Sequence, residues 1–192
     1  MYKMCKTEQS AARQRKLERG LLSAMSIHQY DEISVSDLCD QMGIPRKSFY
    51  RYFSSKDGAL HALIDHTLLE FEAFPNNLKP GEKKTYQKDL ERFFLFWKSQ
   101  KPLLDALERS NISGVLVLRT VSHAMSDAGS LNRFLPQSEK LAREHAITFG
   151  VCGLMSMMLS WHNSGYQMSP AQIADIAVQL MTKPLFSNPN NV

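Results

Sequence analysis

Apolar residues recur every three or four positions along almost the whole sequence, and no run of alternating polar and apolar residues interrupts them. In the first such segment, Leu17, Leu21, Ala24 and His28 share one face of a helix. This spacing matches the 3.6-residue period of an α-helix and not the two-residue period of a strand. The sequence therefore predicts an all-α protein of about nine helices.

The composition is that of a folded intracellular domain. Hydrophobic residues make up 43% of the 192 residues and charged residues 22%, which is enough apolar surface to bury a core. The net charge of +4 permits an anionic partner without requiring one. Cys5, Cys39 and Cys152 are widely spaced, which favours a reducing compartment over a disulfide framework. The most apolar stretch, 146–161, is shorter than the ~20 residues of a membrane span. We interpret it as a buried helix and expect a cytoplasmic protein without a secretory signal.

Residues 33–60 contain the start and stop signals of two short helices in succession. Ser36 is suited to cap a helix over 37–42, and Gly43 follows where a left-handed residue would end it. Pro45 then opens a basic, aromatic segment over 46–53, and Ser54–Asp57 has the form of a capping box that starts a long helix. Two short helices joined by a glycine-containing turn form the helix-turn-helix plan, whose second helix enters the major groove of DNA.

The charge pattern of this segment favours contact with DNA over simple solvation. Between Ile44 and Lys56 there are four cations and no carboxylate, and four of the five residues 49–53 are aromatic. Solvated charge runs normally mix both signs, whereas interleaved cations and aromatic rings suit phosphates and base edges. The DNA-contacting residues that this pattern predicts are Arg46, Lys47, Ser48, Tyr50, Arg51, Tyr52 and Lys56. Phe49 and Phe53 are expected to pack inward, against Leu38 and Leu60. The cluster of cations at 13–19 is as consistent with contact to DNA phosphates as with simple exposure to solvent.

The same residues resemble the DNA-binding region of the TetR (TetR/AcrR) family of transcriptional regulators. The matching features are Ser36, Gly43, the run Phe49-Tyr50-Arg51-Tyr52-Phe53, and Lys56. The resemblance implies phosphate contacts by Ser36, Tyr50, Tyr52 and Lys56, base reading by residues 46–48, and a homodimer formed by the last two long helices. Pro45 departs from the family pattern, since many members have a capping Ser or Thr there and proline has no side chain that can cap. The run 149–170 is similar to the branch of the dihydroxyacetone kinase activator.

Breaks around Pro75–Asn77 and Pro80-Gly81 separate the basic segment from a second helical region. We expect a helix-turn-helix DNA-binding domain over 1–66 and an effector-binding and dimerisation domain over 67–192. Aromatic, methionine and histidine side chains at helical spacing are candidates to line an effector cavity, although such residues are more often plain core. These candidates are Phe93, Trp97, His123, Met125, Phe149, Met155 and Trp161. Ala146, Gly150 and Gly153 favour a close helix–helix contact, either a dimer seam or a bulky neighbour in the same chain.

Three functions remain open at this point. The first is a dimeric DNA-binding regulator, a repressor controlled by a small-molecule effector and reading a pseudo-palindromic operator. The second is an architectural or assembly-type DNA binder without an effector. The third is a small helical enzyme, against which stands the absence of nucleophile-elbow, P-loop, zinc-protease and dinucleotide motifs. His123, His145 and His162 lack the short spacing of a metal site, so we expect no metal and no cofactor.

Overall fold

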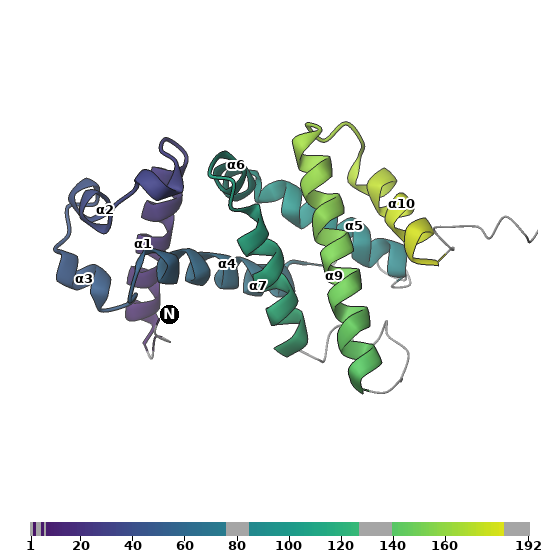
Figure 1. The fold of residues 1–192 in the computed structure, drawn as a ribbon, viewed down its shortest axis with the longest axis horizontal. Coiled ribbons are helices and arrows are strands. Elements are labelled where there is room, and N and C mark those ends of the chain that lie inside the picture. The colour runs from purple at the N-terminus through teal and green to yellow at the C-terminus, as the bar shows by residue number, and fades with distance from the viewer. Residues whose placement is uncertain (1, 3–4, 6, 76–84, 127–139, 183–192) are drawn as a thin grey trace, which may run out of the picture. The chain divides into compact units, whose positions relative to one another are not determined.

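The computed structural model describes residues 2, 5, 7–75, 85–126 and 140–182, with residues 140 and 141 described by their backbone alone. Within these ranges the chain forms nine α-helices, one short 3₁₀ turn and no strand (Figure 1). The prediction of an all-α protein is confirmed. The chain divides into two compact units. The predicted break at Pro80-Gly81 and most of that around Pro75–Asn77 lie outside the described residues.

The first unit combines residues 1–72 with residues 102–127. Its helices are α1 (Glu8–Met25), α2 (Val35–Gln41), α3 (Arg46–Tyr50), α4 (Lys56–Ala73), α6 (Lys101–Arg109) and α7 (Ser113–Ser126), with the 3₁₀ turn η1 (Tyr30–Glu32) between α1 and α2. Helix α4 runs without a break through the boundary that the sequence places between residues 66 and 67. The assignment of DNA binding to 1–66 and effector binding to 67–192 stays a prediction about function.

Local signals explain where the helices of this unit begin and end. Leu17, Leu21 and Ala24 are buried on one face of α1 as expected, whereas His28 lies beyond the helix end and is exposed. Helix α2 begins one residue before the predicted cap, because the Ser34 hydroxyl accepts the hydrogen bond from the Asp37 amide. The expectation that Ser36 caps this helix is therefore wrong. Gly43 has a φ of 64°, the left-handed conformation predicted for it.

Helix α4 starts one residue later than its capping-box pattern indicates. The Ser55 hydroxyl accepts the amide hydrogen bond of Gly58 in the first turn. The apolar side chains of Leu60, Leu63 and Ile64 on α4 are buried. These side chains belong to the core of the first unit.

The second unit combines residues 73–101 with residues 128–192. Its described helices are α5 (Tyr86–Ser99), α9 (Lys140–Asn163) and α10 (Pro170–Thr182), and α5 packs against both others. Helix α10 begins with a capping box, since Ser169 and Gln172 exchange hydrogen bonds between side chain and backbone. Its core is aromatic: Phe94 is fully buried and its ring meets that of Trp161 edge-on at 5.5 Å.

Only one face of α9 is buried, although the sequence predicts a buried helix over 146–161. Met155, Met158 and Trp161 lie in the core, whereas Phe149, Gly153 and the serines of the opposite face are exposed. No helix among the described residues has the length and apolar character needed to cross a membrane.

Candidate nucleic-acid interface

Helix α3 has one fully buried side and one exposed side. Phe49 is 0% exposed, and its ring lies 5.2 Å from that of Phe53, which follows the helix. Both rings point inward, as predicted, and Leu38 and Leu60 are buried in the same unit. On the other side Tyr50 is 51% exposed. The helix is therefore fixed by its aromatic back while its front faces solvent.

The exposed side of α3 carries unpaired positive charge. Arg46, Lys47 and Arg51 are exposed, and none of them has a hydrogen-bond or ion-pair partner among the described residues. Ser48 on the same helix and Ser36 on α2 are half-buried. A cation without a partner in its own chain is free to bind an anion without first breaking an intramolecular bond.

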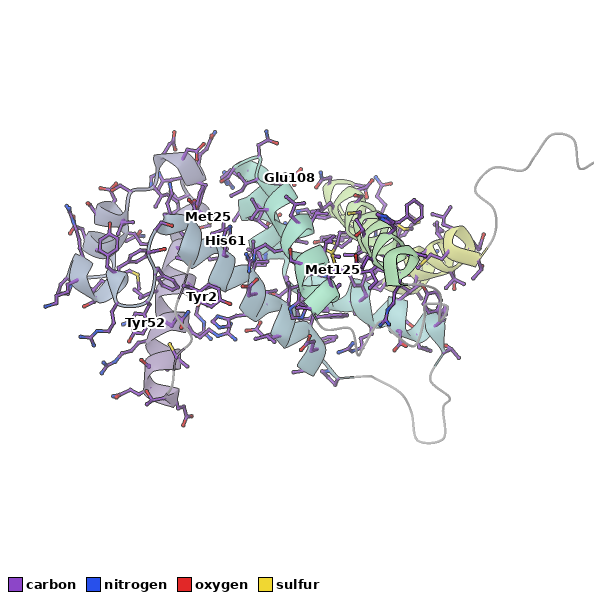
Figure 2. All side chains as sticks on the ribbon, turned by 60° about the horizontal axis from the view of Figure 1, so that its bottom comes forward. Tyr2, Met25, Tyr52, His61, Glu108 and Met125 are labelled. Atoms are coloured by element: carbon purple, nitrogen blue, oxygen red, sulfur yellow. The ribbon has the colours of Figure 1, made fainter. Side chains whose placement is uncertain are left out.

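Tyr52 belongs to the core of the unit, although the sequence predicts that its hydroxyl contacts a phosphate. The side chain is only 6% exposed and its ring lies 6.3 Å from that of Phe53. Its hydroxyl has no hydrogen-bond partner among the described residues. Tyr52, Tyr2 and Met25 all belong to the first unit (Figure 2). Because the ring of Tyr52 is buried, only its hydroxyl group could contact a phosphate.

A single carboxylate of α2 influences the charge of this surface. The Ser34 side chain donates a hydrogen bond to Asp37 at 2.5 Å, and this bond holds the pKa of the Asp37 carboxyl below its usual range. The nearby positive charge of Arg46 acts in the same direction more weakly. Asp37 is therefore ionised at neutral pH, and its charge partly offsets that of Arg46 at the start of α3.

Lys56 is bound within the protein. Its ammonium donates hydrogen bonds to the backbone oxygens of Tyr30 at 2.5 Å and Ile33 at 2.7 Å, and it lies 4.2 Å from the centre of the Tyr30 ring. An ammonium has three N–H donors, and two of them are used here. The sequence predicts that this ammonium contacts a phosphate, whereas the structure places it on the segment that joins α1 to α2.

Tyr30 is the centre of this arrangement and was not predicted as functional. Its hydroxyl donates to Asp57 at 2.6 Å, and its amide donates to the Ser110 hydroxyl at 2.9 Å. Burial, followed by the hydrogen bond to Asp57, raises the pKa of Tyr30. The connection between α1 and α2 is thereby tied to the start of α4 and to the turn between α6 and α7. No short sequence pattern announces these contacts, because their partners are distant along the chain.

Replacing Lys56 with methionine tests whether its ammonium stabilises the fold or contacts a phosphate of DNA. We expect the free energy of unfolding to fall by about 1–3 kcal/mol, because the two carbonyl oxygens lose their donor. The salt dependence of DNA binding should stay that of the wild type. The matched variant Arg51→Met should leave stability unchanged and reduce the salt slope by about 1. Denaturant unfolding and binding titrations at several salt concentrations measure both quantities. If Lys56→Met kept the stability of the wild type but reduced the salt dependence of DNA affinity, Lys56 would instead be a phosphate contact.

The basic cluster of α1 is partly neutralised inside the unit. Arg15 pairs with Glu70 of α4 at 3.3 Å and lies 3.8 Å from Glu18. Arg13, Lys16 and Arg19 are exposed and have no partner among the described residues. Three cations of α1 therefore remain available to an anionic partner.

Residues 23–63 match the family model described as "Bacterial regulatory proteins, tetR family". The matched segment runs from the C-terminal turns of α1 through α2 and α3 into α4, which are the elements that build the surface described above. Residues 23–63 are therefore similar in sequence to regulatory proteins of the tetR family. No curated protein is similar enough in sequence to match the chain.

Solved structures of TetR-type regulators share the fold of nearly the whole chain. A tetR-family transcriptional regulator from Streptomyces coelicolor is 20% identical with a TM-score of 0.56, over 88% of this chain and 78% of that one. The dihydroxyacetone kinase operon activator DhaS is 15% identical with a TM-score of 0.53, over 88% and 93%. The regulator FadR from Bacillus subtilis, solved with stearoyl-CoA, is 13% identical with a TM-score of 0.53, over 90% and 99%. These neighbours are transcriptional regulators, and the likeness at this identity is one of fold.

Outside the segment that matches the family model, four of the seven predicted effector residues lie together in the core of the second unit. Phe93, Trp97, Met155 and Trp161 are all buried there. The Trp161 indole N–H donates to the backbone oxygen of Met168 at 3.0 Å. Trp97 is 1% exposed, and its indole N–H has no hydrogen-bond partner among the described residues. A buried donor without an acceptor costs free energy and is available to an acceptor on a bound molecule.

The other three predicted effector residues lie elsewhere. His123 and Met125 are on α7 in the first unit, where His123 contacts Glu72 at 2.6 Å and Met125 is 43% exposed (Figure 2). Phe149 on α9 is 76% exposed, so its expected place in a cavity lining is corrected to a surface position. Helical spacing identifies the face of a side chain but not whether another helix covers that face. Among the described residues no group of three or more His, Cys, Asp and Glu side chains is arranged to hold a metal ion.

Proposed function

We propose that the protein is a dimeric, sequence-specific DNA-binding transcriptional regulator whose DNA affinity is changed by a small-molecule effector. The observation that carries this proposal is the two-sided character of α3. Its back is fixed by the fully buried Phe49, and its front presents Arg46, Lys47 and Arg51, which have no ion-pair or hydrogen-bond partner in the part of the chain that the structure describes. A rigid helix with free cations on one side suits the major groove, which admits a helix of this width.

Within this proposal the residues of the surface divide into two kinds of contact. Arg46, Lys47 and Ser48 at the start of α3 read base edges, where Arg and Lys suit guanine O6 and N7. Phosphate contacts are proposed for Ser36, Tyr50, Arg51 and Tyr52. Lys56 is assigned a structural role instead, because its ammonium is already bound to two carbonyl oxygens. A protein that acts on DNA in this way works in the cytoplasm of a bacterial cell.

Dimerisation is proposed through α9 and α10 of the second unit. Phe149 projects from α9, and among the described residues no neighbouring atom outside the helix's own backbone lies within 4 Å of a Cβ added at Gly150 or Gly153. Ile176 and Leu180 of α10 are exposed. Glycine inside a helix costs roughly 0.5–1 kcal/mol relative to alanine, and no described neighbour packs closely on these glycines to offset that cost. A second copy packed closely on this face would offset it and cover the apolar side chains.

The effector is proposed to bind in the aromatic core of the second unit. The unpaired Trp97 N–H supports a ligand with a hydrogen-bond acceptor, and the FadR neighbour solved with stearoyl-CoA supports a small-molecule effector in this fold. A ligand changes DNA affinity only if it binds the DNA-competent and the DNA-incompetent conformations unequally. We propose repression, with the effector favouring the conformation that releases the operator.

Substitutions on α3 test the assignment of base readers. Arg46→Ala and Lys47→Ala are each expected to cost about 1–3 kcal/mol of binding to the preferred sequence and to relax sequence preference at one base position. The measurement is titration of a duplex selected by the wild-type protein from a random library, beside a duplex of random sequence. The control Arg51→Ala should weaken both duplexes by similar factors. Equal losses on both duplexes for all three variants would contradict base reading by Arg46 and Lys47.

A further inference from the structure

Tyr2 lies in the segment before α1, and its backbone contacts the end of the proposed recognition helix. It forms an isolated antiparallel bridge with Phe53, which follows α3 by three residues. Phe53 is buried, and its ring packs on that of Phe49 in α3. The bridge therefore joins Tyr2 to the point where the chain leaves α3 and turns towards α4.

The side chain of Tyr2 ends on an ion pair between α4 and α7. Its hydroxyl donates a hydrogen bond to Asp65 Oδ2 at 2.8 Å. Arg119 of α7 donates two hydrogen bonds to the same carboxylate, from Nε at 2.6 Å and from Nη2 at 2.5 Å. Burial, with the hydrogen bond to Asp65 next, raises the pKa of Tyr2 to about 12, so the phenol is a neutral donor at physiological pH.

These contacts form a continuous series from α7 to the end of α3. Arg119 orients the Asp65 carboxylate through both of its oxygens, a geometry that fixes direction as well as distance. Asp65 accepts the Tyr2 phenol, and the backbone of Tyr2 holds that of Phe53. A functional helix keeps one orientation only if its supporting residues are themselves held in place.

We propose that Tyr2 is a positioning residue for sequence reading, which holds the C-terminal end of α3 against the Asp65–Arg119 ion pair. Tyr2 itself does not touch DNA in this role. The inference rests on the proposed function, because a misplaced α3 matters only if α3 reads sequence. Without the Tyr2 hydroxyl the unit stays folded, but α3 takes a wider range of orientations. Specific contacts depend on that orientation, whereas non-specific attraction between cations and phosphates does not.

The test uses Tyr2→Phe, which keeps the ring and removes only the hydroxyl. Its matched control is Thr67→Val, which removes the buried hydroxyl bond from Thr67 to the Leu63 oxygen at 2.8 Å within α4. For each full-length variant we would measure thermal stability and affinity for a duplex selected by the wild type and for a random duplex. The ratio of these affinities should fall about tenfold in Tyr2→Phe and stay at the wild-type value in Thr67→Val. A loss of stability alone does not change this ratio.

A second variant tests whether Tyr2 acts through the ion pair. Arg119→Met should lower the affinity ratio as Tyr2→Phe does, and adding Tyr2→Phe to it should lower the ratio little further. If Tyr2→Phe destabilises the unit too far for binding measurements, hydrogen exchange at the amides of Tyr52 and Phe53 should be faster than in the wild type.

If the Tyr2→Phe variant kept the wild-type ratio of affinities for the selected and the random duplex, the positioning role alone would be overturned. If the variant were too unstable for binding measurements, wild-type rates of hydrogen exchange at the Tyr52 and Phe53 amides would have the same consequence. A wild-type protein that prefers no sequence would overturn the proposed function together with this role.

Discussion

Replacing Phe49 with alanine is expected to lower the free energy of unfolding by about 3–5 kcal/mol. Phe49 is fully buried, and its ring contacts those of Tyr50 and Phe53, at 5.6 and 5.2 Å. The cavity left by the ring removes most of the apolar contact that fixes α3. Since whole domains are stable by only about 5–15 kcal/mol, this loss is a large fraction of the total. Denaturant unfolding followed by circular dichroism measures it.

The adjacent ring provides the matched control for this prediction. The Tyr50 ring meets that of Phe49 edge-on but is 51% exposed, so Tyr50→Ala should change stability by only about 0.5 kcal/mol. The same variant should weaken DNA binding, because the Tyr50 hydroxyl is a proposed phosphate contact. A Phe49→Ala variant as stable as Tyr50→Ala would contradict the two-sided description of α3.

Phe149→Glu is expected to convert a dimer into a monomer and to weaken operator binding by roughly 100-fold or more. A carboxylate at the 76% exposed position on α9 would be buried without a partner in the proposed interface. Loss of the dimer removes the gain in affinity that two linked recognition helices provide. Light scattering after gel filtration measures the oligomeric state, and titration of the selected duplex measures the affinity.

Leu69→Glu is the control for this substitution, because Leu69 is also an exposed apolar residue but belongs to α4 in the first unit. This variant should remain dimeric. If Phe149→Glu also remained dimeric and bound the operator normally, the proposed interface on α9 and α10 would be wrong. In that case the glycines of α9 would need another explanation.

The features that the sequence predicts well are encoded by neighbouring residues. The left-handed turn at Gly43 and the inward rings of Phe49 and Phe53 each depend on a few adjacent positions, and each is confirmed. The error at Ser36, where the cap lies two residues earlier at Ser34, and the one-residue error at Ser54 have the same local origin. In both cases two nearby serines are available to cap one helix.

The features that the sequence does not predict depend on contacts between distant segments. Periodicity places Phe149 on a helix face, but it does not tell whether another helix of the chain covers that face. The ammonium of Lys56 reaches carbonyl oxygens more than twenty positions away, and the hydroxyl of Tyr2 reaches Asp65 over 63 positions. Such pairs leave no periodic signal in a single sequence. The hydrogen bonds from Tyr30 to Ser110 and from Arg119 to Asp65 are also distant in sequence, and they connect α6 and α7 to the N-terminal helices of the same unit.

The most direct test of the central claim is selection of bound duplexes from a random-sequence library, at low and at near-physiological salt, with the wild type and Tyr50→Ala. The proposed regulator should recover a pseudo-palindromic motif whose half-sites are centred ~34–36 Å apart, and Tyr50→Ala should bind it poorly. Recovery of only salt-sensitive binding without sequence preference would contradict the proposed function and would favour an architectural DNA binder.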